Sequence, residues 1–155
     1  MRTPYRATSV RNILCVFPRY TPSFGTFHHS YELLGGVRAF MPPQGLLLIA
    51  NYLPDSWHVR FVDENRQPAS PEDFQWADAV LVSGMHVQRP HIEQIFERAH
   101  RCDRPVAIGG PSASGCPEMY PDADYVHVGE LGGATDRLIE LLDTTEGRPE
   151  KPVLF

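Results

Sequence analysis

Apolar residues gather in five short runs along the chain, and each run is bounded by glycine, proline or aspartate. The runs cover residues 13–17, 59–62, 79–82, 105–108 and 125–128. They are short and rich in β-branched residues, a pattern that predicts β-strands. Three runs are almost continuously apolar, as expected for a parallel sheet covered on both faces. Arg60 and His127 interrupt the second and fifth runs, which favours positions nearer the sheet edges.

Helical patterns fill most of the intervals between these runs. Apolar residues recur at helical spacing over 43–53, from Pro90 to Ala99, and over 131–142. Residues 71–76 and 117–120 are expected to form single helical turns. Strands that alternate with helices predict a doubly wound α/β fold. Five strands in a chain of this size favour a flavodoxin-like parallel sheet of order 2-1-3-4-5 with helices on both faces.

The chain of 155 residues suits one domain. We expect an N-terminal extension over 1–11, the domain itself over 12–143, and a linker over 144–155. The last segment is polar and contains Pro149 and Pro152, and the apolar residues 153–155 have no obvious core to join. The chain is therefore expected to be the N-terminal piece of a longer protein.

Charge and composition exclude several classes of function. The net charge is −5, and the acidic residues are dispersed, which argues against nucleic-acid binding. Lys151 is the only lysine, so that neither a Walker phosphate loop nor a Schiff-base lysine in the core is available. The three cysteines form no CxxC pair, which argues against a thiolate metal site. The N-terminus shows no signal-type apolar stretch, and no run approaches the length of a membrane span, so we expect a cytoplasmic location.

In an open parallel sheet, ligands bind beyond the carboxyl ends of the strands. The connection after the first predicted strand is about two dozen residues long, far above the usual ~2–6, and long loops are usually functional or disordered. The fourth and fifth strands both run into glycines, at 109–110 and 129. These glycines serve either tight turns or the close approach of backbone to a large ligand.

Other kinds of functional site are less well supported by the sequence. His28 and His29 are adjacent, and no third ligand has suitable spacing, so no metal site is predicted. No GxSxG nucleophile elbow follows a strand, and no catalytic residue is assigned. Asp63 could hold a ribose or could cap its strand, but no GxGxxG accompanies it. The hydroxyl residues of 21–26 surround a glycine as in a flavodoxin phosphate loop, although Pro22 removes an N–H that a phosphate would need.

Six segments together resemble the N-terminal cobalamin-binding domain of B12-dependent radical SAM proteins. They are residues 13–18, 41–46, 61–65, 82–85, 109–112 (Gly-Gly-Pro-Ser) and 127–132. The long stretch 18–40 is most similar to the subgroup that contains the hopanoid C-2 methylases. The resemblance implies a domain that holds cobalamin over the strand ends, beside a downstream domain that carries a 4Fe-4S cluster and S-adenosylmethionine. It also implies a methyltransferase that acts on an unreactive carbon.

The resemblance assigns cofactor-binding residues one by one. Along the nucleotide tail it implies Ser83, Gly84 and Met85 on one side, with Gly109, Gly110 and Pro111 on the other. Beneath the corrin it implies Arg19, Tyr20, Thr21, Pro22, Gln44 and Gly45. Gly129 and Glu130 would close the far edge, and Asp63, Asn65 and Ser112 complete the set.

Two motifs are missing from the sequence. Without CxxxCxxC the chain cannot itself hold the iron–sulfur cluster, and without DxHxxG it lacks the usual histidine for the lower face of the cobalt. Two other functions remain open at this stage. One is a free-standing FMN-binding electron-transfer protein, and the other is a fold without cofactor that serves as a docking surface.

Overall fold

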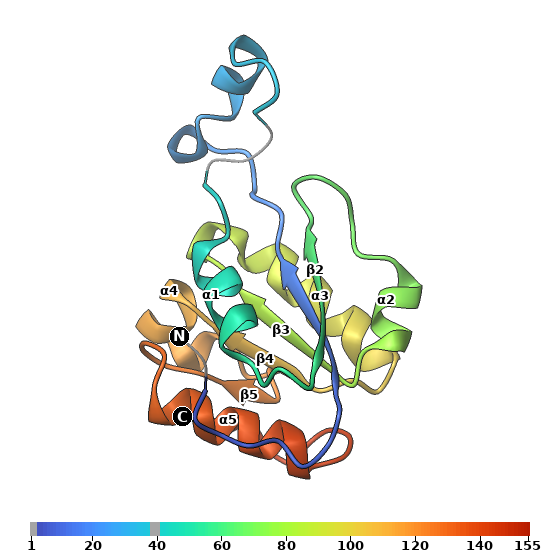
Figure 1. Cartoon of the computed structure of the whole chain (residues 1–155). Coiled ribbons are helices and arrows are strands. Elements are labelled where there is room, and N and C mark those ends of the chain that lie inside the picture. Colours follow the sequence, from blue (N-terminus) through green and yellow to red (C-terminus); the bar gives the residue numbers. More distant parts are fainter. Residues whose placement is uncertain (1–2, 38–40) are drawn as a thin grey trace.

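The computed structural model describes residues 3–37 and 41–155. Six parallel strands form one sheet in the order β2-β1-β3-β4-β5-β6 (Figure 1). The strands are β1 (Asn12–Phe17), β2 (His58–Asp63), β3 (Ala79–Ser83), β4 (Val106–Gly109), β5 (Tyr125–Val126) and β6 (Val153–Leu154). The predicted fold class and the order of the first five strands are confirmed.

Helices cover the two faces of the sheet. They are α1 (Gln44–Tyr52), α2 (Pro71–Trp76), α3 (Arg89–Arg101), α4 (Pro111–Gly115) and α5 (Gly133–Thr144). Short 3-10 helices are η1 (Phe24–Thr26), η2 (His28–Leu33), η3 (His86–Gln88) and η4 (Pro117–Met119). Within the described part of the chain, no helix has both the length and the apolar character needed to cross a membrane.

The strands send alternate side chains into two separate apolar cores. Leu14 and Val16 of β1 lie in the core that α2 and α3 cover, whereas Ile13 and Cys15 lie in the core that α1 and α5 cover. Both faces of the central strands are therefore buried, which explains why these strands read as continuous apolar runs. Arg60 interrupts β2 because β2 is an edge strand, as predicted.

The sixth strand corrects the expectation that residues 153–155 have no core to join. The Val153 N–H donates to the Asp124 carbonyl at 2.9 Å, and the Phe155 N–H donates to the Val126 carbonyl at 3.0 Å. The Phe155 ring also packs on Tyr125, with 6.3 Å between ring centroids. The end of the chain thus extends the sheet. The domain boundary at residue 143 and a linker role for the polar residues before β6 stay predictions.

The N-terminal extension is tied to α5 through Asp143, which is buried. Its carboxylate accepts hydrogen bonds from the Tyr5 hydroxyl (2.9 Å) and the Thr8 N–H (2.7 Å), and also from the N–H of Ser9 (3.0 Å). These donors hold the pKa of Asp143 well below its usual range, against the opposing effect of burial. The described part of the extension, residues 3–11, is therefore bonded to the folded domain.

Two side-chain amides, that of the buried Gln88 and that of the half-buried Asn65, fix the start of the first loop. Gln88 donates to the Pro18 carbonyl at 2.5 Å and accepts from the Met85 N–H at 2.8 Å, which joins the ends of β1 and β3. Asn65 accepts from the Tyr20 N–H at 3.0 Å and donates to Pro18 at 3.4 Å, which joins the ends of β1 and β2. The strand ends that face ligand in folds of this class are thereby held in register.

Candidate functional site

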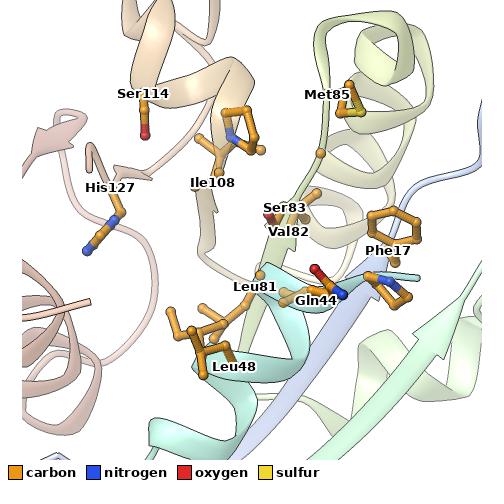
Figure 2. A pocket seen from close by; sticks show the side chains of 18 of the residues that line it. Phe17, Gln44, Leu48, Leu81, Val82, Ser83, Met85, Ile108, Ser114 and His127 are labelled. Carbon is orange, nitrogen blue, oxygen red and sulfur yellow. The ribbon is translucent and has the colours of Figure 1, made fainter. Parts of the chain in front are cut away.

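A cavity of about 560 Å³ lies at the carboxyl ends of β1, β3 and β4, between α1 and α5. We call it the strand-end cavity; Figure 2 shows side chains from these elements around it. Its size falls within the ~300–1,000 Å³ that small-molecule sites occupy. It lies where a parallel sheet of this class binds its ligands.

The floor of the cavity is apolar. Leu81 and Ile108 come from the strands, Leu48 from α1 and Leu138 from α5. Both helices also contribute buried residues to the core on this face of the sheet, Leu46 and Tyr52 from α1 and Ile139 and Leu142 from α5. An apolar slot of this kind suits a flat ring system rather than a charged group.

The wall between β3 and β4 requires glycine at one position. Gly110 has φ +87°, a conformation that L-residues rarely adopt, and a Cβ atom there would collide with the Ser83 hydroxyl. At Gly84 a Cβ would lie 3.0 Å from both Ile92 Cδ1 and Pro18 Cγ, so this glycine permits close packing of the first loop and α3. The two glycines therefore serve different purposes: Gly110 leaves room for the Ser83 hydroxyl, and Gly84 leaves room for the side chains of Ile92 and Pro18.

Few polar groups reach the cavity. The Ser114 hydroxyl accepts a hydrogen bond from the Gly129 N–H at 2.9 Å. Within residues 3–37 and 41–155, the Ser83 hydroxyl has no hydrogen-bond partner. Gln44 adds an amide at the start of α1 (Figure 2). These groups are neutral and can donate to the oxygens of a ligand.

His127 forms part of the wall on the α5 side and is buried. Its Nε2 lies 2.9 Å from the Thr135 hydroxyl oxygen, which also accepts from the Gly132 N–H at 3.1 Å. Burial lowers the pKa of His127, although a hydrogen bond to its own carbonyl and the charge of Glu130 act in the opposite direction. The imidazole is therefore neutral near pH 7 and contributes a polar but uncharged surface.

Among the described residues that line the cavity, Glu130 is the only one with a full charge at neutral pH, and it is exposed. No Lys or Arg of the described chain lines it. The described residues also contain no group of three or more His, Cys, Asp or Glu side chains placed to hold a metal ion. The cavity is thus built for a large, mostly neutral ligand.

Eleven of the residues assigned from the sequence line this cavity. They are Tyr20, Gln44, Gly45, Ser83, Gly84, Met85, Gly109, Gly110, Pro111, Gly129 and Glu130. They come from loops far apart in sequence, and the parallel arrangement of the strands brings them to one edge. Their contact with a cofactor stays a prediction.

The other six assigned residues lie outside the cavity lining: Arg19, Thr21, Pro22, Asp63, Asn65 and Ser112. Three have clear structural partners. Asp63 accepts from the Asn65 side chain at 2.8 Å, which supports the bonds of Asn65 to the first loop. Ser112 is buried, and its hydroxyl lies 2.6 Å from that of Tyr120 and 2.9 Å from His86 Nδ1.

Arg19, Thr21 and Pro22 lie outside the cavity lining, and their contact with a corrin ring stays a prediction. Arg19 is exposed, and its guanidinium lies 3.5 Å from His91 Nδ1 on α3. The Thr21 hydroxyl is buried without a hydrogen-bond partner in the described structure.

Sequence reasoning missed several lining residues. Most are apolar positions that also belong to helices or strands, so nothing in their pattern separates cavity from core: Phe17, Leu46, Leu48, Ile49, Leu81, Val82, Ala107, Ile108, Leu131 and Leu138. Ser114 and His127 carried a usable signal. His127 interrupts the apolar run that predicts the fifth strand, and Ser114 is a small polar residue four positions after Gly110.

Comparisons with known proteins agree with this geometry. The sequence model of the B12 binding domain family matches residues 33–139. The chain is 64% identical over 145 residues to the hopanoid C-2 methylase of Rhodopseudomonas palustris (strain TIE-1), covering 94% of this chain and 28% of that protein. It is 33% identical over 135 residues to an uncharacterized methyltransferase of Synechocystis sp. (strain PCC 6803), covering 86% of this chain and 25% of that protein. The chain thus spans about a quarter of the length of these curated relatives.

Proposed function

Because the chain belongs to the B12-binding domain family, we propose that its strand-end cavity receives the nucleotide tail of cobalamin while the corrin ring lies over the strand ends. The family resemblance inferred from the sequence is confirmed by the match over residues 33–139. The assignment of individual contacts is our own. It includes the eleven assigned residues that line the cavity and adds Ser114 and His127.

The observation that carries the proposal is the relation of Gly110 to Ser83. Here the Ser83 hydroxyl lies so close to the Gly110 backbone that a Cβ atom on residue 110 would collide with it. A cavity with glycines in its wall and an apolar floor suits a planar base followed by a ribose and a phosphodiester. The neutral donors Ser83 and Ser114 can then bond the ribose or phosphodiester oxygens.

The residues present also fit the remainder of the cofactor. The rim of a corrin ring carries neutral amides, which need backbone groups and small polar side chains rather than cations. Gln44, Gly45 and Met85 surround the mouth of the cavity, and none is charged. When bound, cobalamin supplies a cobalt centre that can carry a methyl group. The role of this chain is to bind and orient it.

The activity of a whole protein that contains such a domain is a further part of the proposal. The chain covers only 28% of the hopanoid C-2 methylase and 25% of the second methyltransferase. We propose that it works with a radical SAM domain, which would hold the iron–sulfur cluster and S-adenosylmethionine, in methyl transfer to an unreactive carbon. A cytoplasmic location belongs to the same proposal.

An FMN-binding electron-transfer protein fits the site less well. FMN carries a phosphate with a double negative charge, which normally binds to N–H groups of a loop or a helix N-terminus. The cavity lining described here has no cation, and Glu130 adds a negative charge. In the loop that would hold the phosphate, Pro22 lacks an N–H, and both it and Thr21 lie outside the cavity.

Reconstitution of the purified chain tests the proposal. The chain is incubated with hydroxocobalamin, or with FMN in a parallel sample, and free ligand is removed by gel filtration. We expect a corrin absorption spectrum that elutes with the protein in about one equivalent, and no retained flavin. Retained flavin without corrin uptake would reject cobalamin in favour of FMN. Retention of neither would reject tight binding by this chain.

A further inference from the structure

The first loop carries a strongly exposed apolar surface, which stands away from the body of the domain (Figure 1). The exposed fractions are 95% for Phe24, 85% for Leu33, and 54% for both Phe27 and Leu34. These four residues define what we call the projecting apolar surface. Apolar residues are common on protein surfaces singly, but a group of this kind marks an interaction site.

The loop is locally ordered in a way that directs these side chains outward. Thr26 is buried, its hydroxyl donates to the Ser23 carbonyl at 3.0 Å, and its carbonyl accepts from the Tyr31 hydroxyl at 2.5 Å. The Phe24 and Phe27 rings lie on one side of this turn, with 6.4 Å between their centroids. Thr26 is thus buried, whereas Phe24 and Phe27 are exposed. A turn that stays in water would be expected to show the opposite arrangement.

The position of the projecting apolar surface restricts where its binding partner can lie. The loop leaves the sheet at the carboxyl end of β1, on the edge that carries the strand-end cavity. Since β6 is parallel to β5, the chain also reaches Phe155 at this edge. A partner that contacts the projecting apolar surface would therefore lie on the side of the cavity mouth.

The curated relatives indicate which polypeptide would contact the projecting apolar surface. In the 64%-identical relative, 28% of the polypeptide matches this chain and the remainder lies outside it. We infer that the projecting apolar surface docks onto this remaining polypeptide and holds it over the cavity mouth. The inference rests on the proposed function, because that function requires a second domain that acts on the cofactor. We assign this second domain to the remaining polypeptide. Docking buries Phe24 and Leu33 and removes an apolar surface that this chain alone leaves in water.

Hydrogen exchange can test the inference with two proteins. The first is this chain alone, and the second is a chimera in which it replaces the matched part of the 64%-identical relative. We expect amide exchange over residues 24–34 to be at least tenfold slower in the chimera than in the isolated chain. In the chimera with Phe24→Ser and Leu33→Ser, this protection should disappear. Equal exchange in the isolated chain and the chimera would overturn the inference.

A matched control distinguishes docking from a general loss of apolar residues. Val10→Ser with Val59→Ser also removes two exposed apolar side chains, but at the amino ends of the strands, and should leave the protection intact. Protection that the control also abolishes would contradict docking through the first loop. So would protection that arises in the isolated chain at high concentration, which would assign the surface to a second copy.

Cobalamin binding separates this inference from the proposed function. The isolated chain with Phe24→Ser and Leu33→Ser should take up cobalamin as the unchanged chain does, because neither residue lines the cavity. If neither isolated form binds cobalamin and the chimera still shows protection, the proposed function fails while the docking surface stands. If both bind cobalamin and the chimera shows no protection, only the docking inference fails.

Discussion

The Ser114 hydroxyl oxygen accepts a hydrogen bond from the Gly129 N–H at 2.9 Å. This bond links α4 to the loop after β5 across one side of the strand-end cavity. Because the oxygen already accepts a bond, the hydroxyl proton remains to be donated. Ser114 lines the cavity, where its side chain lies on the same side as His127 (Figure 2). A ligand oxygen that enters there would meet a fixed donor.

Replacing Ser114 with alanine should weaken cobalamin binding about 2–13-fold, since a neutral hydrogen bond contributes ~0.5–1.5 kcal/mol. Binding of cobinamide, a corrinoid without the nucleotide tail, should not change. Spectrophotometric titration of the purified chain with both corrinoids measures the two affinities. The exposed serine of the 53–58 connection provides the matched control, Ser56→Ala, which should change neither. Equal losses for both corrinoids would contradict a contact with the tail.

Gly45 allows the cavity to be filled without strain on the backbone. It lies in the first turn of α1, and a Cβ atom there would be 3.7 Å from the Ser83 hydroxyl, an ordinary contact. We expect Gly45→Leu to reduce cobalamin affinity at least 100-fold, because its branched side chain would occupy the mouth of the cavity. The thermal midpoint should not fall, since leucine is a better helix former than glycine. Cobalamin titration and thermal unfolding measure the two effects.

The control for this experiment is Gly45→Ala, which should retain binding within a few-fold and raise stability by up to ~1 kcal/mol. Gly110 is less suitable for the same purpose. Any side chain there meets both the left-handed backbone at φ +87° and the Ser83 hydroxyl, so its replacement should lower stability together with binding. Full binding by Gly45→Leu would show that the cofactor avoids this side of the cavity.

The fold was predicted correctly where the pattern of apolar residues was strong. Strands buried on both faces produce continuous apolar runs, and β1, β3 and β4 were recognised in this way. The sixth strand has only two paired residues, Val153 and Leu154, and follows a polar segment with two prolines. It forms because the edge of β5 offers unpaired groups, such as the Asp124 carbonyl, and because Phe155 packs on Tyr125. Such pairing depends on tertiary context, which a local pattern does not contain.

The candidate site was predictable from its glycines and loops but not from its floor. Gly109 and Gly110 stand out in sequence, whereas Leu81 and Leu138 look like ordinary core residues. Asn65, a polar residue at a strand end, is also assigned to the cofactor, and that assignment stays a prediction. In the structure its side chain bonds the backbone of the first loop, at Pro18 and Tyr20. Sequence alone does not distinguish a polar group that faces a ligand from one that fixes a loop.

Asp143→Asn should destabilise the domain by about 2–4 kcal/mol, because a buried charged acceptor of several hydrogen bonds is lost. The donors that remain, including the Tyr5 hydroxyl and the Thr8 N–H, would lose their strongest partner. Urea unfolding at pH 7 measures the difference between the two proteins. Glu140→Gln, at an exposed ion pair with Arg137 on the same helix, is the control and should change stability by under ~1 kcal/mol.

The pH dependence of this difference follows from the direction of the shift. The pKa of Asp143 is lower in the folded state than its ordinary value near 4, so protons bind more tightly to the unfolded state. The stability that Asp143 contributes is therefore complete above about pH 5 and declines as the pH falls toward the lowered pKa. We expect the two unfolding free energies to converge in acid. A difference that stays constant from about pH 7 to pH 3 would contradict the role of the ionised carboxylate.

The last prediction concerns the lower face of the cobalt in the cobalamin-loaded chain. If the nucleotide tail occupies the strand-end cavity, the base of the cofactor is held away from the metal, and a nitrogen ligand would have to come from the protein. The first loop contributes Tyr20 to the cavity lining, and the start of α1 contributes Gln44, whereas His29 does not line it. No carboxylate follows His28 or His29 directly to orient an imidazole. We therefore expect no histidine on the cobalt.

Electron paramagnetic resonance of the Co(II) form distinguishes the possibilities, because one coordinating nitrogen splits each cobalt line into three. We expect unsplit lines for the loaded chain, and the same spectrum for His28→Ala and His29→Ala. Triplets that disappear in either variant would identify a protein ligand and contradict the prediction. Triplets that persist in both variants would also contradict the prediction if they vanish in His127→Ala, because His127 lies in the cavity wall. Triplets that persist in all three variants would indicate that the cofactor's own base remains on the metal, with the nucleotide tail outside the cavity. The spectrum of Gly45→Leu, loaded at high cobalamin concentration, then tests whether blocking the cavity restores that base to the cobalt.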